Sequence, residues 1–198
     1  MKKTGIMGGT FNPIHNGHIY LAKCAMEYFK LDNVLFMPTG NSYMKTNVLN
    51  AEHRVNMTRI AIENEPNFEL STIEADMPGN SYTYKTLQIL KDLNKDTEYY
   101  FITGADAVMS MGKWLNPQLI FNNCVVVATT RNDYDMLHLN DKVSGYKKAY
   151  NADIRLFNTT PIDISSTDIR EYVKNKQDIS AYVPKKVLKY IEDNKLYQ

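Results

Sequence analysis

Short apolar runs alternate along the chain with longer stretches in which apolar residues recur at helical spacing. The apolar runs occupy residues 4–7, 33–38, 68–72, 99–103, 124–129 and 154–157. Helical spacing is clear in residues 19–29 and 87–93, and less regular in residues 55–62. This alternation predicts an α/β fold, namely a Rossmann-like, doubly wound and mostly parallel sheet with helices on both faces.

The pattern continues without an internal repeat or a low-complexity linker, which predicts a single domain over residues 1–198. Residues 39–50 are polar and weakly periodic, as expected of a mobile loop. An exposed helix is expected around residues 139–150. The chain should end in a helical closing segment from about residue 165 to residue 198, with Pro184 at the first position of its last helix.

The charge balance bears on the class of partner. Lys and Arg number 23 against 22 for Asp and Glu, so the net charge is +1. This gives no electrostatic reason to expect a nucleic-acid or membrane-surface partner. The N-terminal residues lack the apolar stretch of a signal peptide, and Gly, Asn and Pro interrupt the long uncharged runs at residues 4–22 and 114–130. We therefore expect a cytoplasmic enzyme or binding domain.

The loop after the first predicted strand combines several features that favour anion binding. Gly8 and Gly9 follow that strand directly, and glycine lets the backbone approach a phosphate closely. His15 and His18 come where the first helix should begin, and residues three apart share one helix face. The unpaired N–H groups of a helix start add a partial positive charge. A triphosphate would suit this combination.

Two other interpretations of the histidine pair stay open at this point. In the first, Asn16 simply caps the helix between two ordinary surface histidines. Zinc binding is the second alternative, but no further Cys, His or carboxylate stands at a supporting spacing. The chain has neither a GxGxxG nor a GxxxxGK[ST] motif, which disfavours Rossmann dinucleotide binding and P-loop chemistry.

The sequence GGTFNPIHNGH at residues 8–18 resembles the GGTFDPxHxGH signature of the nucleotidyltransferases that carry an HxGH motif. These enzymes join a nucleoside triphosphate to a phosphorylated acceptor and release pyrophosphate. The resemblance implies a nucleotidyltransferase fold with His15 and His18 as catalytic residues, and ATP-binding roles for Gly8, Gly9, Thr10 and Phe11. Asn12 departs from the signature, where Asp is usual, and it keeps a short polar side chain without the negative charge.

A second motif comes after the last predicted strand. Ser165 and Asp168 have the spacing of a capping box, so a helix should begin there. Taken alone, this segment needs no role beyond capping. The sequence ISSTDIR at residues 164–170 is similar to the ISSTxIR motif of bacterial nicotinate-mononucleotide adenylyltransferases. The resemblance implies that the β- and γ-phosphates of ATP bind Ser165, Ser166, Thr167 and Arg170.

The middle of the chain resembles the same family. NSYTYKT at residues 80–86 is similar to its PSYT segment, and GADAVMSMGKW at residues 104–114 to its GxD…W segment. The resemblance implies that the Tyr82 backbone N–H and the Thr83 hydroxyl hold the nicotinate carboxylate, and that Trp114 stacks on the pyridine ring. It places Gly104 and Asp106 in the ATP site. A core Trp114 and a helix-capping Asp106 are the simpler alternatives.

Residues 42–45 differ from the PPHK sequence that the family usually carries. Lys45 is present, but Met44 stands where histidine is usual and cannot donate to a phosphate. Lys45 and Arg131, which matches a basic position of the family, are expected to bind the acceptor. An exposed Arg131 without such a role is equally simple.

These resemblances predict transfer of the adenylyl group of ATP to nicotinic acid mononucleotide. Mg²⁺ is expected to arrive with ATP, held by phosphate oxygens and water, so no metal site built from protein ligands is expected. The same chemistry on nicotinamide mononucleotide or phosphopantetheine stays an alternative, as does a nucleotide-binding regulator without turnover. The oligomeric state is open, a homo-oligomer included.

Overall fold

A computed structural model describes residues 1–40, 48–130, 136–160 and 162–198. Its sheet has six strands in the order β3-β2-β1-β4-β5-β6, which is the order of a doubly wound Rossmann sheet. The strands are β1 (Lys2–Gly9), β2 (Asn33–Pro38), β3 (Phe68–Leu70), β4 (Thr97–Gly104), β5 (Val125–Thr130) and β6 (Ile154–Asn158). The pairs β1–β4, β4–β5 and β5–β6 are parallel. The predicted fold class is confirmed.

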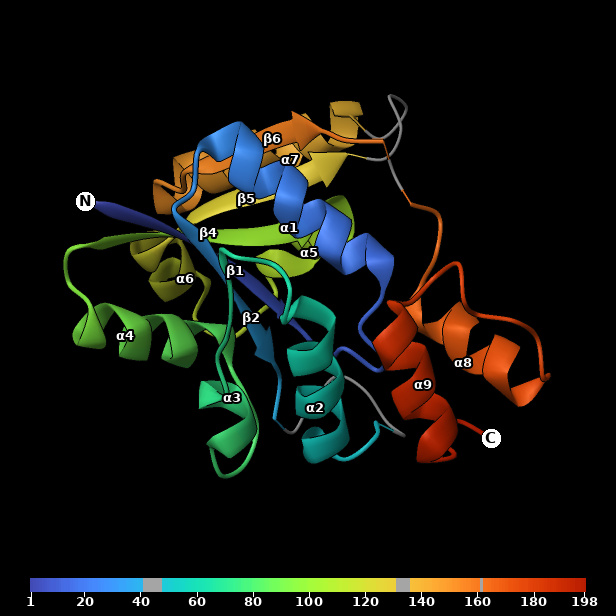
Figure 1. Ribbon diagram of the computed structural model, residues 1–198. Coiled ribbons are helices and arrows are strands. Elements are labelled where there is room, and N and C mark those ends of the chain that lie inside the picture. The colour runs from blue at the N-terminus through green and yellow to red at the C-terminus, as the bar shows by residue number, and fades with distance from the viewer. Residues whose placement is uncertain (41–47, 131–135, 161) are drawn as a thin grey trace. The chain divides into compact units, whose positions relative to one another are not determined.

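Helices connect the strands, as Figure 1 shows. They are α1 (Asn16–Phe29), α2 (Ala51–Ile62), α3 (Ile73–Asp76), α4 (Thr83–Leu93), α5 (Ala105–Met111), α6 (Pro117–Asn123), α7 (Met136–Tyr150), α8 (Ser166–Lys174) and α9 (Lys185–Asp193). The three stretches of predicted helical spacing correspond to α1, α2 and α4. No helix in the described ranges is long and apolar enough to cross a membrane.

The chain forms two compact units. The first consists of Met1–Gly8, Leu21–Leu35 and Tyr82–Thr160, and the second of Gly9–Tyr20, Phe36–Ser81 and Pro161–Gln198. The strands β1 and β2 and the helix α1 therefore begin in one unit and end in the other. That residues 1–198 behave as one domain stays a prediction.

In the first unit, helices cover both faces of the sheet. Successive residues of β4 point to opposite faces, so each face contributes side chains that pack against a helix. The Tyr100 ring faces α1 and lies 6.0 Å from the ring of Phe29. The neighbouring Tyr99 points the other way, and its hydroxyl donates to the Leu90 carbonyl of α4. Val126 and Val127 of β5 are fully buried, as their uncharged run predicted.

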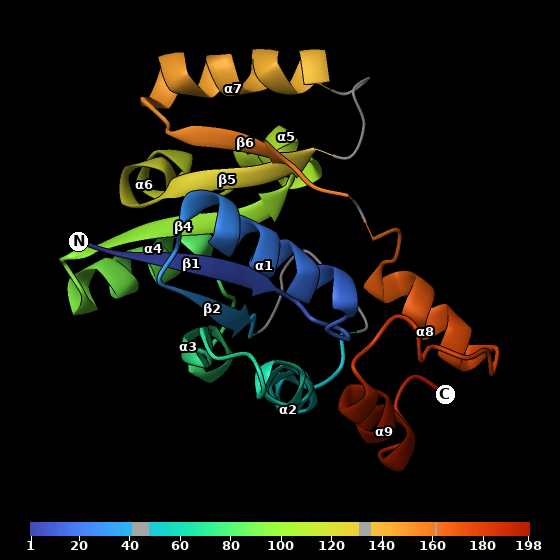
Figure 2. The same ribbon diagram turned by 45° about the horizontal axis from the view of Figure 1, so that its top comes forward.

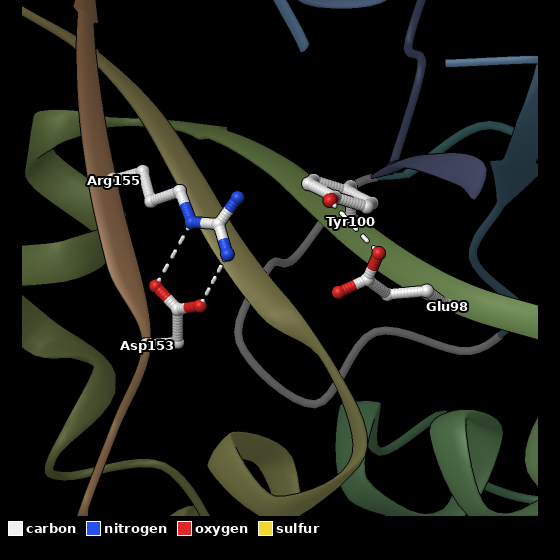
Figure 3. A network of polar contacts seen from close by, with 4 residues as sticks. All are labelled: Glu98, Tyr100, Asp153 and Arg155. Carbon is white, nitrogen blue, oxygen red and sulfur yellow. Dashed lines mark hydrogen bonds and ion pairs between the residues drawn. The ribbon is translucent and has the colours of Figure 1, made fainter. Parts of the chain in front are cut away.

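A polar network lies where β4 and β6 begin, away from the carboxyl ends of the strands (Figure 3). The Tyr100 hydroxyl donates to Glu98, and Arg155 pairs with Asp153 at 2.6 Å. The Arg155 guanidinium also lies 5.7 Å from the centre of the Tyr100 ring. Burial raises the pKa of Tyr100. This network stabilises the amino-terminal ends of β4 and β6, whereas the chemistry is expected at the carboxyl ends of the strands.

In the second unit, α9 packs against α2 (Figures 1 and 2). Val187 and Ile191 of α9 are buried, and the Tyr190 hydroxyl is 3.0 Å from Nδ1 of His53 on α2. The closing helix is therefore present as predicted. Pro184 is its N-cap, one residue before the position expected from the sequence.

Candidate functional site: the second unit

The loop that follows β1 is held in one conformation by close packing. Phe11 is 2% exposed and has a φ of 48°, and its ring meets the His18 ring edge-on at 5.0 Å. A Cβ atom on Gly9 would lie 2.9 Å from the Phe11 ring, so only glycine fits there. The Gly9 carbonyl accepts a hydrogen bond from the Thr39 N–H. The predicted ATP-binding residues Gly9, Thr10 and Phe11 thus form a rigid loop.

The two histidines of the HxGH motif lie side by side. The ring centres of His15 and His18 are 3.7 Å apart, and His15 is buried while His18 is half-buried. The His15 backbone N–H donates to Nδ1 of His18 at 3.3 Å. Because Nδ1 accepts this bond, a neutral His18 carries its proton on Nε2. His18 therefore has an N–H donor on the far side of its ring.

Gly17 and Asn16 fix the histidines at the start of α1. A Cβ atom on Gly17 would lie 3.0 Å from Nδ1 of His15, so the glycine leaves room for that imidazole. The Asn16 side chain donates to the Ala181 carbonyl, and its backbone N–H donates to the Tyr182 carbonyl. Because α1 begins at Asn16 itself, Asn16 is not the N-cap residue, and the simple capping alternative is wrong.

The capping box at the start of α8 is present as predicted. The Ser165 hydroxyl accepts from the Asp168 backbone N–H at 3.1 Å, and the Asp168 carboxylate accepts from the Ser165 backbone N–H at 2.9 Å. Hydrogen bonds from the Ser165 side chain and backbone hold the pKa of Asp168 below its usual range. Asp168 is thereby engaged in the cap.

Residues of α8 contact the loop after β1. The Ser166 hydroxyl donates to the Pro13 carbonyl at 2.8 Å, and Nη1 of Arg170 donates to the Asn12 carbonyl at 2.8 Å. Nη2 of Arg170 donates to the Thr167 hydroxyl. The two motifs predicted to bind ATP, more than 150 residues apart in sequence, therefore lie together within the second unit.

Sequence reasoning missed two residues that support this arrangement. The Tyr197 hydroxyl donates to the side-chain oxygen of Asn12 at 2.9 Å. Arg54 of α2 is 1% exposed and donates to the Thr10 carbonyl at 2.8 Å. The only local signal for Arg54 is a charged residue on the buried face of α2, next to Val55.

The remaining predicted residues

Five predicted residues that follow the first helix belong to the first unit. Tyr82 is the N-cap of α4 and Thr83 its first residue, and both are half-buried. Gly104 is the N-cap of α5, and Asp106 is exposed in the first turn of that helix. The N-cap position thus belongs to Gly104, so the simple capping role for Asp106 is wrong. Trp114 is the fifth of these residues.

Trp114 is half-buried and held from two sides. Its indole Nε1 donates to the Ser110 hydroxyl at 3.3 Å, and its ring meets the Phe101 ring edge-on at 6.2 Å. Gly8 also belongs to the first unit, as the last residue of its segment Met1–Gly8. Lys45 and Arg131 lie outside the described residues, as does most of the predicted loop at residues 39–50.

Metal ligands are sparse in what the structure describes. No group of three or more His, Cys, Asp and Glu side chains is arranged to hold a metal ion among residues 1–40, 48–130, 136–160 and 162–198. Asp168 is held in its capping box.

Comparisons with known proteins

The class of protein follows from the fold, the paired loops and a family model together. Residues 6–172 match the family model described as cytidylyltransferase-like. A solved nicotinic acid mononucleotide adenylyltransferase of Plasmodium falciparum, complexed with NaAD, superimposes with a TM-score of 0.83 at 20% identity. The alignment covers 100% of this chain and 98% of that one, so the two share the nucleotidyltransferase fold.

Curated relatives narrow the class. A probable nicotinate-nucleotide adenylyltransferase of Clostridium novyi is 41% identical over 100% of both chains. A protein of the same description from Clostridium botulinum (strain Eklund 17B / Type B) is 40% identical and is covered to 99%. The chain belongs to the nicotinate-nucleotide adenylyltransferase family of nucleotidyltransferases.

Proposed function

We propose that the chain transfers the adenylyl group of ATP to the 5′-phosphate of nicotinic acid mononucleotide. The products are nicotinic acid adenine dinucleotide, a precursor in NAD biosynthesis, and pyrophosphate. The observation that carries the proposal is the pairing of His15 and His18 beside the α8 start and Arg170 in one unit. The relatives that share 40–41% identity over the whole chain are described as enzymes of this activity.

The reaction needs no general base, because the acceptor's 5′-phosphate is already an anion near neutral pH. It is an in-line displacement at the α-phosphorus of ATP, in which an acceptor oxygen forms the new P–O bond and pyrophosphate leaves. The protein must hold two polyanions in line and stabilise the charge on the transferring group. The Nε2–H of His18 is the donor best placed by its tautomer for this task.

The triphosphate is proposed to bind between the loop after β1 and the start of α8. Gly8, Gly9, Thr10 and Phe11 supply backbone groups, and the α8 start supplies hydroxyl and N–H donors from Ser165, Ser166 and Thr167. Nη1 of Arg170 donates to the Asn12 and Ser166 carbonyls. Arg170 therefore meets the phosphates through its remaining N–H groups while staying anchored to the loop.

Mg²⁺ is proposed to enter as the ATP complex and to neutralise charge on the phosphates. Gly104 and Asp106 are also proposed to take part in ATP binding, and Asp106 is exposed in the first turn of α5.

The acceptor is proposed to bind through Tyr82, Thr83 and Trp114, with Lys45 and Arg131 at its phosphate. A carboxylate accepts hydrogen bonds only, whereas a carboxamide must also place an NH₂ donor. The Tyr82 backbone N–H and the Thr83 hydroxyl would suit the acid and oppose the amide. Leaving such groups poorly paired costs about 1–3 kcal/mol, which corresponds to roughly ten- to hundredfold discrimination.

Pyrophosphate release tests the proposal. Wild-type protein is assayed with ATP and Mg²⁺, and with nicotinic acid mononucleotide, nicotinamide mononucleotide or phosphopantetheine as the acceptor. We expect kcat/KM to be highest for the acid mononucleotide. A higher kcat/KM for one of the other acceptors would change the proposed acceptor, but it would still support adenylyl transfer. ATP binding without turnover on any acceptor would support the non-catalytic alternative.

A further inference from the structure

Arg54 is a buried cation bound to three backbone carbonyls from separate segments. Its Nε donates to the Leu49 carbonyl at 2.8 Å, Nη1 to the Thr10 carbonyl at 2.8 Å, and Nη2 to the Gly40 carbonyl at 2.9 Å. The side chain is 1% exposed. One guanidinium therefore ties the loop after β1 to the chain beyond β2 and to the segment that leads into α2.

Burying a guanidinium is unfavourable, because the charge loses its hydration. Burial accordingly lowers the pKa of Arg54, and the nearby Tyr197 raises it by less. A well-packed apolar side chain of similar volume would avoid this cost. Such a side chain would leave the Thr10 and Gly40 carbonyls without their donor.

The bond to the Thr10 carbonyl also sets the direction of a neighbouring donor. The Thr10–Phe11 peptide is trans and planar, so its C=O and N–H groups point in opposite directions. Because the carbonyl points at Arg54, the Phe11 N–H points away from it. The Gly9 carbonyl, which accepts from the Thr39 N–H, fixes the preceding peptide in the same way.

This N–H belongs to the loop that carries the histidine pair. Phe11 contacts His18 edge-on, and its φ of 48° turns the chain sharply at this residue. If the Thr10–Phe11 peptide rotated, its oxygen would replace its N–H on the other side of the loop. A carbonyl oxygen facing a phosphate would repel it, so the direction of this one peptide matters for anion binding.

We propose that Arg54 is a positioning residue that holds the Thr10–Phe11 peptide so that the Phe11 N–H donates to a phosphate of the bound nucleotide. Arg54 itself does not touch the substrate. The proposal rests on the triphosphate site of the proposed function, but it is independent of which acceptor is used.

The first test compares Arg54→Lys with Arg59→Lys, a matched control on the same helix. Arg59 is exposed and donates to the Asn56 side chain. Lysine keeps the charge but lacks the planar fork that binds several carbonyls at once. Binding of a non-hydrolysable ATP analogue and of adenosine is measured by calorimetry, and folding by circular dichroism and thermal unfolding.

Arg54→Lys should weaken the ATP analogue on the order of tenfold, as expected for one misdirected hydrogen bond to a charged group. Adenosine, which has no phosphate, should bind within about twofold of wild type. Arg59→Lys should change neither. Equal weakening of both ligands, or an unchanged affinity for the analogue, would overturn the proposal and leave Arg54 a purely structural residue.

A second measurement uses wild-type protein, so it decides the question even if the lysine variant does not fold. Inorganic tripolyphosphate is titrated while the amide resonance of Phe11 is followed by ¹⁵N-edited NMR. We expect this amide to shift downfield with saturation, while amides of the exposed α7 surface stay in place. Binding of tripolyphosphate without a shift at Phe11 would contradict the proposal. Because no acceptor is present, this result does not depend on adenylyl transfer.

Discussion

The hydroxyl of Tyr197 donates a 2.9 Å hydrogen bond to the side-chain oxygen of Asn12. The backbone carbonyl of Asn12 accepts a second bond from Nη1 of Arg170. The end of the chain therefore helps to hold the loop that precedes the histidine pair. Asparagine stands here where the family signature has aspartate, and its amide oxygen keeps an acceptor for Tyr197 without adding a charge.

Tyr197→Phe should lower both stability and turnover. Loss of the hydroxyl removes one hydrogen bond, which typically contributes about 1 kcal/mol to the free energy of unfolding. The loop should then position the histidines less well, so kcat should fall roughly tenfold. Tyr190→Phe is the control, because its hydroxyl contacts His53 and Asn56. Denaturant unfolding and steady-state rates are compared. A similar kinetic loss in both variants would remove the special role of Tyr197.

Asn12→Asp should weaken ATP binding at low ionic strength. The new carboxylate adds a negative charge to the residue whose backbone carbonyl accepts from Arg170, in the loop of the proposed triphosphate site. We expect Kd for an ATP analogue to rise several-fold in about 0.05 M salt, and the difference to shrink in about 0.5 M salt, where the Debye length is short. Tighter binding in the variant would show that a carboxylate at this position assists the nucleotide.

Gly17→Ala should impair turnover more than folding. The added methyl group would lie 3.0 Å from Nδ1 of His15 and would push the imidazole away from its position. Displacements of about 1 Å at a reacting centre can cost on the order of 100-fold in rate. Gly145→Ala in α7 is the control, because nothing lies within 4 Å of its added Cβ. If both alanine variants have wild-type kcat, the position of His15 is not limiting.

The capping box gives α8 a defined dependence on pH. The pKa of Asp168 is lowered in the folded state, first by the Ser165 side chain. A lowered pKa means that its contribution to stability is present above the ordinary carboxyl pKa of about 3.9, and is lost as the pH falls through the lower folded value. Asp168→Asn should therefore be less stable than wild type near neutral pH, and the two should converge only when the pH falls below the lowered pKa of Asp168 in the folded state. A difference that persists unchanged in acid would contradict this assignment.

Local patterns in the sequence predicted most of the fold, since residues 99–103 of β4 and 125–129 of β5 are uncharged and largely buried, and α1 has regular helical spacing. The apolar run predicted at residues 68–72 forms only the three-residue strand β3, in which Glu69 is exposed. The short helices α3, α5 and α6 were not predicted, since each has too few residues for a clear period.

The histidine pair and the capping box were also predictable, because each lies within a few consecutive residues. Arg54 and Tyr197 were not predicted, because their roles depend on partners far along the chain. Arg54 contacts a carbonyl 44 residues away, and Tyr197 a side chain 185 residues away. Periodicity indicates which face of a helix is buried, but it does not identify the backbone carbonyls from distant segments that accept hydrogen bonds on that face.

Adenylyl transfer is tested most directly by the product formed from ATP and nicotinic acid mononucleotide by wild-type protein and by His18→Ala. We expect one pyrophosphate for each nicotinic acid adenine dinucleotide with wild-type protein. A normally folded His18→Ala should be slower by about 100- to 1000-fold, because one donor to the developing charge is lost. Absence of the dinucleotide with wild-type protein, or a His18→Ala rate equal to wild type, would contradict adenylyl transfer assisted by His18.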